Sequence, residues 1–264
     1  MLLSIITPTY NRPDDLKLNY KIIKKNYKNN NLEWILISET SDHKTQRVIS
    51  KFDKKIVKNF SGNWKGKNDK AFNFGLKQSK GYLINIHGDD DFFGKNFMHH
   101  LQKVFRPHIS WYIGYGEYLN DDYGKSRWII TFIKKQLLNL ENFKLMNCVN
   151  FIMTPSIFFR RSLVSRSGLR TTKQFSDYYL WIDILSMHKP FVIKKNLSFA
   201  KYSSNTKTGT FDLDRYFMIS KHIRKKKISF FYYCMHILSI FFIISFHFFN
   251  KFIPSKIYQI LNNK

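Results

Sequence analysis

The chain has 264 residues, 44% of them hydrophobic and 17% aromatic, which excludes a disordered protein and allows one large domain or two small ones. Its 44 Lys and Arg against 18 Asp and Glu give a formal net charge of +26. That charge indicates an anionic partner such as nucleic acid, an anionic membrane face or a phosphorylated substrate. A general richness in Lys, Asn, Ile and Phe is an alternative explanation for the same charge.

Several classes of site have no support in the sequence. Cys148 and Cys234 lie far apart and fit no zinc-binding spacing, which favours a reducing compartment without a disulfide framework. The N-terminus MLLSIITPTYNRP has no basic segment before its short apolar run, so it is typical of a first strand rather than a signal peptide. No P-loop, dinucleotide-binding or zinc-protease motif occurs.

The first hundred residues alternate between strand and helix patterns. Strands are predicted at 2–7, 33–38, 55–60 and 82–87, and helices are predicted from Pro13, near 43–52 and after Asn68 as a cap. The inner face of the third helix would carry Ala71, Phe72, Leu76 and Ser79. This alternation indicates an α/β fold with a mostly parallel sheet and helices on both faces.

Beyond residue 110 the pattern is less regular. Residues 110–119 and 126–133 are predicted to be antiparallel strands around a turn at 120–125, and a further strand is predicted at 150–161. A helix is predicted at 175–188, with Leu180, Trp181, Ile184 and Leu185 on its buried face.

Three adjacent aspartates, Asp89, Asp90 and Asp91, follow the strand predicted at 82–87. Ligands of open parallel sheets bind outside the carboxyl ends of the strands, and Gly88 allows a tight turn at this position. Two carboxylates about 5 Å apart repel by roughly 3 kcal/mol at an effective dielectric of 20, so a cation is expected to hold them. All-oxygen ligands favour Mg²⁺ or Mn²⁺ bridging to a diphosphate, whereas a solvated acidic turn is the alternative.

Four segments in order resemble family 2 glycosyltransferases of the GT-A fold, which are inverting enzymes that use nucleotide-diphosphate sugars. They are SIITPTYNRPDDL, AFNFGLKQSKGYLINIHGDDDFF, SIFFRRSLVSRSGL and FSDYYLWIDI, and the likeness covers about residues 3–205. The resemblance implies a nucleotide-sugar-binding half at 1–110 and an acceptor-binding half of the same Rossmann-like domain at 111–210. The composition of residues 211–264 predicts a basic and apolar, membrane-associating helical tail.

The resemblance also implies roles in donor binding. Thr7, Pro8, Thr9 and Tyr10 match the loop that holds the nucleotide base, with Tyr10 placed to stack on it. Glu39, in SETS (38–41), stands where the family usually has an aspartate in Asp-Asp-Gly-Ser, so the base is not specified. Lys65, Lys67, Lys70 and Asn73 match the diphosphate-facing positions, whereas Phe72 stands where the family often has an arginine.

The metal and the catalytic base follow from the same resemblance. Asp89 and Asp90 match the metal-binding pair, with Asp91 beside them and Mn²⁺ or Mg²⁺ as the cofactor, and Asp89 also matches a nucleotide-binding position. Asp177 matches the general base that takes a proton from the acceptor hydroxyl. The alternative for Asp177 is a favourable interaction with the helix dipole. Asp183 is expected to be structural.

The C-terminal tail joins the basic run RKKK (224–227) to an uncharged stretch, Ile228–Phe249. As a helix this stretch would be about 33 Å long, enough to cross a bilayer. Polar residues recur on one helical face, which favours a helix lying in the surface of an anionic membrane, with a single span or a buried core hairpin as alternatives.

The leading hypothesis is a glycosyltransferase at the cytoplasmic face of a bacterial inner membrane. It would use a nucleotide-diphosphate sugar, with UDP first, and would extend a lipid-linked glycan such as a lipopolysaccharide or capsule precursor. Two alternatives are a catalytically inactive, membrane-docked binding protein and a basic nucleic-acid-binding protein. No nucleic-acid partner is expected, because that alternative explains neither the ordered motifs nor the aspartate cluster, whose carboxylates would repel phosphate unless a metal intervenes.

Overall fold

The computed structural model describes residues 2–29, 31–64, 66–119, 124–147, 150–164, 176–201, 234 and 237–238. Its contacts divide the chain into two units, one made of residues 1–119 and 152–201 and the other of 120–151 and 202–264. Lys65, Cys148 and nearly all of the predicted tail, including 224–227, lie outside the described residues. The predicted boundaries at residues 110 and 210 divide the chain by function, into a donor-binding half, an acceptor-binding half and a tail. A division by contacts does not test them, so they stay predictions.

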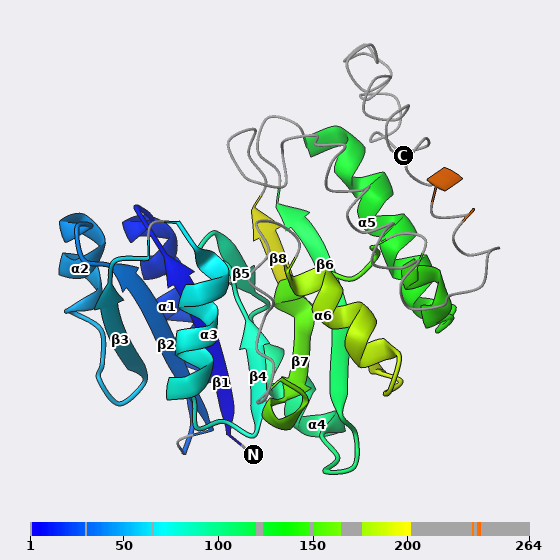
Figure 1. Ribbon diagram of the computed structural model, residues 1–264, viewed down its shortest axis with the longest axis horizontal. Coiled ribbons are helices and arrows are strands. Elements are labelled where there is room, and N and C mark those ends of the chain that lie inside the picture. The colour runs from blue at the N-terminus through cyan, green and yellow to red at the C-terminus, as the bar shows by residue number, and fades with distance from the viewer. Residues whose placement is uncertain are drawn as a thin grey trace. The chain divides into compact units, whose positions relative to one another are not determined.

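The first unit contains a mixed sheet, which Figure 1 shows with its helices. Its strands are β1 (Leu3–Thr9), β2 (Leu32–Glu39), β3 (Val57–Gly62), β4 (Leu83–Ile86), β5 (Asp91–Phe93), β6 (Trp111–Leu119), β7 (Ile157–Arg160) and β8 (Phe191–Lys201). Their order is β3-β2-β1-β4-β7-β6-β8-β5. The strands β3, β2, β1 and β4 are parallel, β7 is antiparallel to both of its neighbours, and β8 is parallel to β6 and antiparallel to β5.

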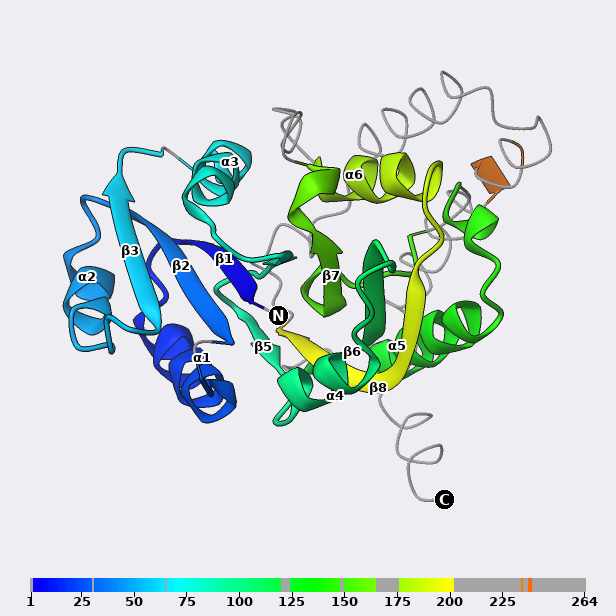
Figure 2. The ribbon, with the colours of Figure 1, turned by 90° about the horizontal axis from the view of Figure 1, so that it is seen from below.

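Helices cover both faces of this sheet, as the α/β prediction requires. Figure 2 shows α1 (Pro13–Asn26), α2 (His43–Ile49) and α4 (Phe97–Val104) on one face and α3 (Asn68–Gln78) and α6 (Ser176–Leu185) on the other. Pro13 begins α1, with Asp14 and Asp15 in its first turn and Lys24 and Lys25 in its last, an arrangement that complements the helix dipole.

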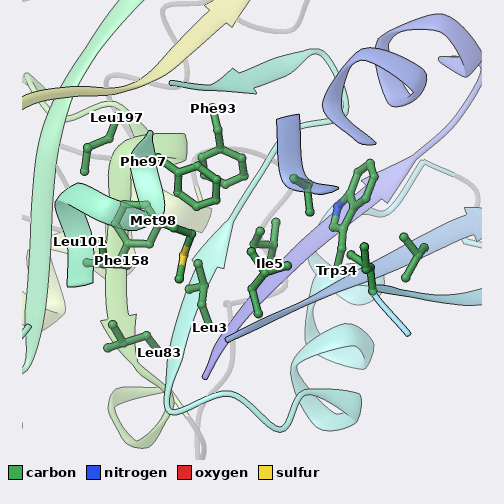
Figure 3. Packing of buried hydrophobic residues seen from close by; sticks show 14 of the residues in the cluster. Leu3, Ile5, Trp34, Leu83, Phe93, Phe97, Met98, Leu101, Phe158 and Leu197 are labelled. Carbon is green, nitrogen blue, oxygen red and sulfur yellow. The ribbon is translucent and has the colours of Figure 1, made fainter. Parts of the chain in front are cut away.

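The core between the sheet and the α1, α2 and α4 layer is apolar and closely packed. Figure 3 shows Leu3 and Ile5 from β1 between Trp34 from β2 on one side and Phe97 and Phe158 from α4 and β7 on the other. The Trp34 indole donates a hydrogen bond of 3.0 Å to the Thr7 hydroxyl, so the buried nitrogen is satisfied.

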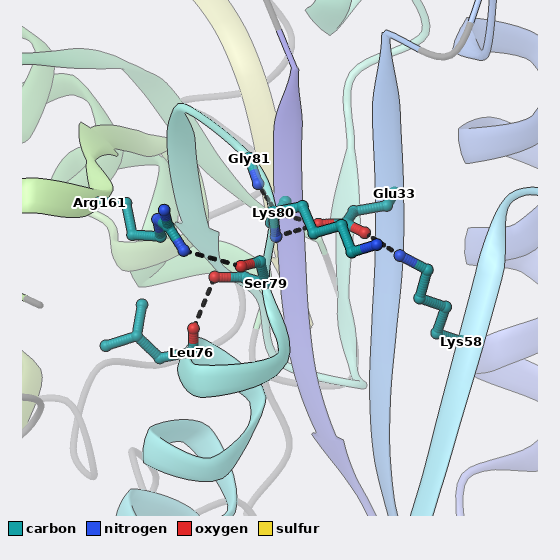
Figure 4. Close-up of polar contacts among 8 residues, drawn as sticks. Glu33, Lys58, Leu76, Ser79, Lys80, Gly81 and Arg161 are labelled. Atoms are coloured by element: carbon teal, nitrogen blue, oxygen red, sulfur yellow. Dashed lines mark hydrogen bonds and ion pairs between the residues drawn. The ribbon is translucent and has the colours of Figure 1, made fainter.

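A buried carboxylate joins several elements at the amino end of the parallel strands. Glu33 accepts hydrogen bonds from Ser4 Oγ at 2.6 Å, from the Lys80 backbone at 2.6 Å and from Lys58 Nζ (Figure 4). Burial raises the pKa of Glu33, but these hydrogen bonds outweigh it, so the pKa lies below its ordinary value of 4.5. The cluster connects β1, β2 and β3 to the segment before β4.

The second unit contains α5 (Gly124–Asn139) and a short 3₁₀ helix, η1 (Phe143–Asn147). The prediction of a strand at 126–133 was therefore wrong. Consecutive apolar residues fit both periodicities, and the absence of Gly and Pro between Lys125 and Asn139 allows the longer helix.

Other expectations needed smaller corrections. Asn68 does not cap α3 through its side chain, because Lys67 holds the cap position and makes no side-chain cap bond. The strand expected at 150–161 is only β7, since a 3₁₀ turn at Thr154–Ser156, η2, contains Pro155 and interrupts it. On α6, Leu180, Trp181 and Ile184 are buried as expected, whereas Leu185 is half-buried.

Three elements, α4, β5 and β8, were not predicted.

No helix in the part of the chain that the structure describes is both long and apolar enough to cross a bilayer.

Candidate active site

The predicted site residues of β1 and β4 lie where the order of the parallel strands reverses. The chain passes from β1 outward to β2 and β3, and then returns to β4 on the other side of β1. Crevices at the carboxyl ends of strands at such a switch point are where ligands bind in α/β sheets. Tyr10 follows β1, and Asp89 to Asp91 follow β4, so both segments lie where such a crevice is expected.

Asp89 connects the two strand ends directly. Its Oδ2 accepts a hydrogen bond of 3.1 Å from the Tyr10 backbone N–H. Burial and the neighbouring Asp90 raise the pKa of Asp89 to about 6, and the Tyr10 hydrogen bond offsets part of that rise. Tyr10 itself is 62% exposed, so its ring is accessible for stacking on a base.

Asp90 faces a small network of charges. Its Oδ2 lies 3.6 Å from Arg12, which also lies 3.8 Å from Asp15, and Lys201 Nζ lies 3.4 Å from Asp15. Burial raises the pKa of Asp90 although Arg12 favours the charged form. The network joins the start of α1, the end of β8 and the aspartate turn.

Asp91 is held through its backbone as well as its side chain. Its carbonyl oxygen accepts a hydrogen bond of 2.7 Å from Asn19 Nδ2 and lies 3.0 Å from His87 Nε2. Its Oδ2 accepts a hydrogen bond of 3.2 Å from the Gly88 N–H, and a Cβ at Gly88 would lie 2.6 Å from that oxygen. A larger residue at position 88 would therefore displace the Asp91 carboxylate.

Burial is the main cause that raises the pKa of Asp91 to about 8, and the charge of Asp90 is the next. Asp89 and Asp177 contribute in the same direction. Burial lowers the pKa of His87 to about 3, so its imidazole is neutral, and it stacks on Phe93 with ring centroids 4.0 Å apart. Sequence reasoning missed Asn19 and His87, since nothing local marks them as partners of Asp91.

Asp177 lies in the first turn of α6, as expected. Its Oδ2 accepts a hydrogen bond of 2.6 Å from Thr154 Oγ1. The η2 turn that carries Thr154 packs against β4, β5, β6 and β8. Asn85 Nδ2 anchors this turn through the carbonyl oxygens of Pro155 at 3.0 Å and Ile157 at 2.8 Å. Since β4 precedes the aspartate turn and β5 begins within it, Thr154 holds the Asp177 carboxylate on the part of the sheet that carries the turn.

The residues predicted to bind the nucleotide base fall into two groups. Thr7 and Thr9 are buried, with Thr7 bonded to Trp34, whereas Pro8 and Glu39 are half-buried near the strand ends. Glu39 Oε2 accepts a hydrogen bond of 3.1 Å from the Trp64 backbone N–H, which sequence reasoning did not foresee. This bond fixes the loop after β3 beside β2.

The diphosphate-facing candidates lie at the beginning of α3. Lys67 and Lys70 are exposed and Asn73 is half-buried, so all three are reachable from solvent. Phe72 is buried in the core, which explains why this position carries no charge. Lys65 lies outside the described residues.

The oxygen donors of Asp89, Asp90 and Asp91 are chemically suited to Mn²⁺ or Mg²⁺. Burial, and after it the repulsion between neighbouring carboxylates, raises the pKa of Asp89 and of Asp91, and the charge of a bound dication would oppose that rise. Within the described ranges, however, no three His, Cys, Asp or Glu side chains are arranged so that they could hold a metal ion. The metal ligands stay a prediction from the sequence.

The chain matches the model of the family described as Glycosyl transferase family 2 over residues 4–168. Among solved structures it is similar to S. aureus TarS, with 17% identity and a TM-score of 0.62, covering 84% of this chain and 39% of that one. A TarS fragment, residues 1–349, solved in complex with UDP-GlcNAc, matches with 17% identity and a TM-score of 0.60 over 84% of this chain and 65% of the fragment.

Two further structures contain Mn²⁺. The mannosyltransferase PcManGT from Pyrobaculum calidifontis, in complex with GDP-Man and Mn²⁺, is 14% identical with a TM-score of 0.56 over 78% of this chain and 57% of that one. Glucosyl-3-phosphoglycerate synthase from Mycobacterium tuberculosis, in complex with Mn²⁺, UDP and glucosyl-3-phosphoglycerate, is 13% identical with a TM-score of 0.54, covering 84% and 76%.

None of the curated proteins compared matches the chain. The family match covers more than half of the chain, and the solved structures share its fold. The chain therefore belongs to glycosyl transferase family 2, a family of inverting, nucleotide-sugar-dependent enzymes with the GT-A fold.

Proposed function

We propose that this chain transfers a sugar, with inversion, from a nucleotide-diphosphate sugar to the hydroxyl of a glycan acceptor. The observation that supports the proposal is that Asp177 is hydrogen-bonded to Thr154 of η2, and that η2 packs against β4 and β5, the two strands joined by the aspartate turn. A base and a group of oxygen ligands at one crevice are what inverting transfer requires. UDP is the first nucleotide to test, since TarS and the synthase were solved with UDP.

Each residue has a defined part in the proposed reaction. Tyr10 stacks on the base, and Lys70 and Asn73 face the diphosphate. Asp177 takes the proton of the acceptor hydroxyl, while Thr154 orients the Asp177 carboxylate for that task. Asp89 and Asp90, with Asp91 beside them, are the pair that would supply carboxylate oxygens to Mn²⁺ or Mg²⁺, whose chemistry when bound is to neutralise the departing diphosphate as a Lewis acid.

Donor binding is tested first by calorimetric titration of UDP, with and without Mn²⁺, into the wild type and Asp89→Asn. We expect metal-dependent binding in the wild type and its loss in the variant. Asp14→Asn is the matched control, because the Asp14 side chain is 88% exposed and lies on the first turn of α1. Wild-type binding that is unchanged in Asp89→Asn would contradict the donor site proposed here.

Transfer is tested separately with UDP-GlcNAc, the donor in one TarS complex, and with GDP-mannose, the donor in the PcManGT complex. NMR of the product would give the configuration at the transferred sugar carbon, and inversion is expected. Donor binding without turnover on any glycan acceptor would instead indicate a catalytically inactive binding protein.

The acceptor is proposed to be a lipid-linked bacterial glycan reached from the cytoplasmic face of the membrane. The uncharged stretch 228–249 next to the basic run 224–227 is the feature that supports this assignment. Comparing transfer to a membrane-bound lipid-linked glycan with transfer to its soluble, delipidated form tests it. Equal rates on the two forms would count against a membrane acceptor.

A further inference from the structure

The two helix layers of the first unit differ in charge. The α1, α2 and α4 layer contains seven Lys and Arg and two Asp, a net charge of +5. The α3 and α6 layer on the opposite face contains two Lys and three Asp, a net charge of −1. Exposed lysines occur on the α3 and α6 layer too, such as Lys67 and Lys80 beside α3, but its helices have an excess of aspartate, so a uniformly lysine-rich composition does not account for the difference.

The two acids of the basic layer lie at one end of it and are already paired. Asp14 pairs with Lys17 at 2.8 Å, and Asp15 lies near Arg12 and Lys201 at the crevice. Farther along the layer Lys21, Lys25 and Arg47 are exposed, and none of them has an acidic partner among the described residues. The loop after α2 adds exposed Lys51, Lys54 and Lys55.

The elements that carry these cations, α1, α2 and the loop after α2, are packed against one another. Tyr20 of α1 stacks on Phe52 with ring centroids 4.2 Å apart, and the Tyr20 hydroxyl accepts a hydrogen bond of 3.1 Å from the Asp53 backbone. Lys24 lies 5.7 Å from the centre of the Tyr20 ring. The helices α1 and α2 therefore present their charges as one surface, which we call the α1–α2 face: the exposed cations of residues 17–55.

The apolar content of this face distinguishes between anionic partners. Leu18, which is 47% exposed, lies on the same side of α1 as Lys21 and Lys25, at helical spacings of three and seven residues. Within α1, α2 and α4 no Phe, Tyr or Trp is exposed, so no ring there is presented to stack on nucleobases. Lysines around an aliphatic side chain fit the headgroup region of an anionic bilayer.

We propose that the α1–α2 face docks on anionic phospholipid, so that the catalytic domain itself, and not only the C-terminal tail, contacts the membrane. Arg12, which immediately precedes α1, lies 3.6 Å from Asp90, so a docked α1 would keep the aspartate turn within about 20 Å of the docked lysines, the length of the helix. The use of this docking rests on the proposed function, because a lipid-linked acceptor would be presented at that surface.

The test is binding of the full chain to vesicles of phosphatidylglycerol and phosphatidylcholine, without donor or acceptor. Lys21→Gln/Lys25→Gln is compared with Lys77→Gln/Lys80→Gln, a pair of exposed lysines at the end of α3 on the opposite face. We expect the α1 double variant to bind about 25-fold more weakly, from the loss of two contacts of about fivefold each. The α3 double variant should bind as the wild type does.

Both variants keep the same tail, so a difference between them reports on the face alone. Equal binding of the two variants would overturn the proposal, as would equal wild-type binding to pure phosphatidylcholine vesicles. Single-stranded RNA is the competing ligand: if the α1 variant loses RNA binding but not vesicle binding, the face binds nucleic acid and the proposal fails. Calorimetry with UDP on both variants tests the proposed function separately, because neither pair contacts the donor site.

Discussion

Asp177 is the side chain on which the proposed chemistry depends most directly. Asp177→Asn keeps the shape of the side chain and an oxygen that can accept the hydrogen bond from Thr154, but it removes the basic carboxylate. We expect kcat to fall by about 10²–10⁴-fold, the usual contribution of a general base, with UDP affinity unchanged. Transfer assays and calorimetry on the same preparation measure the two quantities. A variant that keeps its wild-type kcat would exclude Asp177 as the base.

Replacing Gly88 with a larger residue would force the aspartate turn to rearrange. In Gly88→Ala the new Cβ would lie 2.6 Å from Asp91 Oδ2 and 3.1 Å from Asp90 Oδ1, so both carboxylates must move. We expect metal-dependent UDP binding to weaken at least tenfold while the urea midpoint changes little, because the turn is half-buried. Unchanged UDP affinity by calorimetry would show that the turn geometry is not needed.

At the scale of elements, α3 packs on β1 and β2 through Gly75. A Cβ at position 75 would lie 2.5 Å from Ile6 Cγ2 and 3.2 Å from Ile37 Cγ1, so Gly75→Ala overpacks this contact. Overpacking costs about 1–3 kcal/mol and alanine favours the helix by about 1 kcal/mol, so we expect a net loss of about 0–2 kcal/mol in the free energy of unfolding. Urea unfolding measures it, with the exposed Lys77→Ala on the same helix as a control expected within about 0.5 kcal/mol. A stabilised Gly75→Ala would mean that α3 shifts without cost.

The contribution of Glu33 to stability, through its bonds that connect β1, β2 and β3, depends on pH. Its pKa is below 4.5 in the folded protein, so its contribution to stability is present above that value and is lost as the pH falls through the folded pKa. At pH 7 we expect Glu33→Gln to be about 1–3 kcal/mol less stable, since Lys58 and the Lys80 N–H lose a charged partner. Urea unfolding at pH 7 and pH 4 should show the difference between the two proteins shrinking. A difference that is constant with pH would argue against the charged cluster.

For the whole molecule, the net charge of +26 is itself a source of instability. Like charges repel more in the compact state than in the unfolded chain, and salt screens that repulsion. We therefore expect the urea midpoint to rise when NaCl is increased from about 0.02 to about 0.5 M, where the Debye length falls below about 8 Å. The Lys77→Gln/Lys80→Gln variant should show a smaller rise, and a midpoint that falls with salt would show that attractive ion pairs dominate.

Much of the fold and part of the site could be predicted from local patterns. Buried parallel strands are short apolar runs, and Pro13 and the glycine before the three aspartates mark the element ends within a few residues. The strand β8 was missed because its burial alternates irregularly along Phe191–Lys201, so no clear periodicity indicates it. The helix α5 was taken for a strand because a run of apolar residues fits both structures until its neighbours are known.

The amino-acid sequence by itself determined that an α/β sheet forms, that three aspartates end one of its strands, and that Asp177 begins a helix. These features depend on residues close together in the chain. Only the tertiary structure decided that Asn19 holds the carbonyl of Asp91, that Thr154 holds the Asp177 carboxylate, and that the cations gather on the α1 side of the sheet. These depend on pairs 72 and 23 residues apart and on the face that each helix covers, which no local periodicity contains.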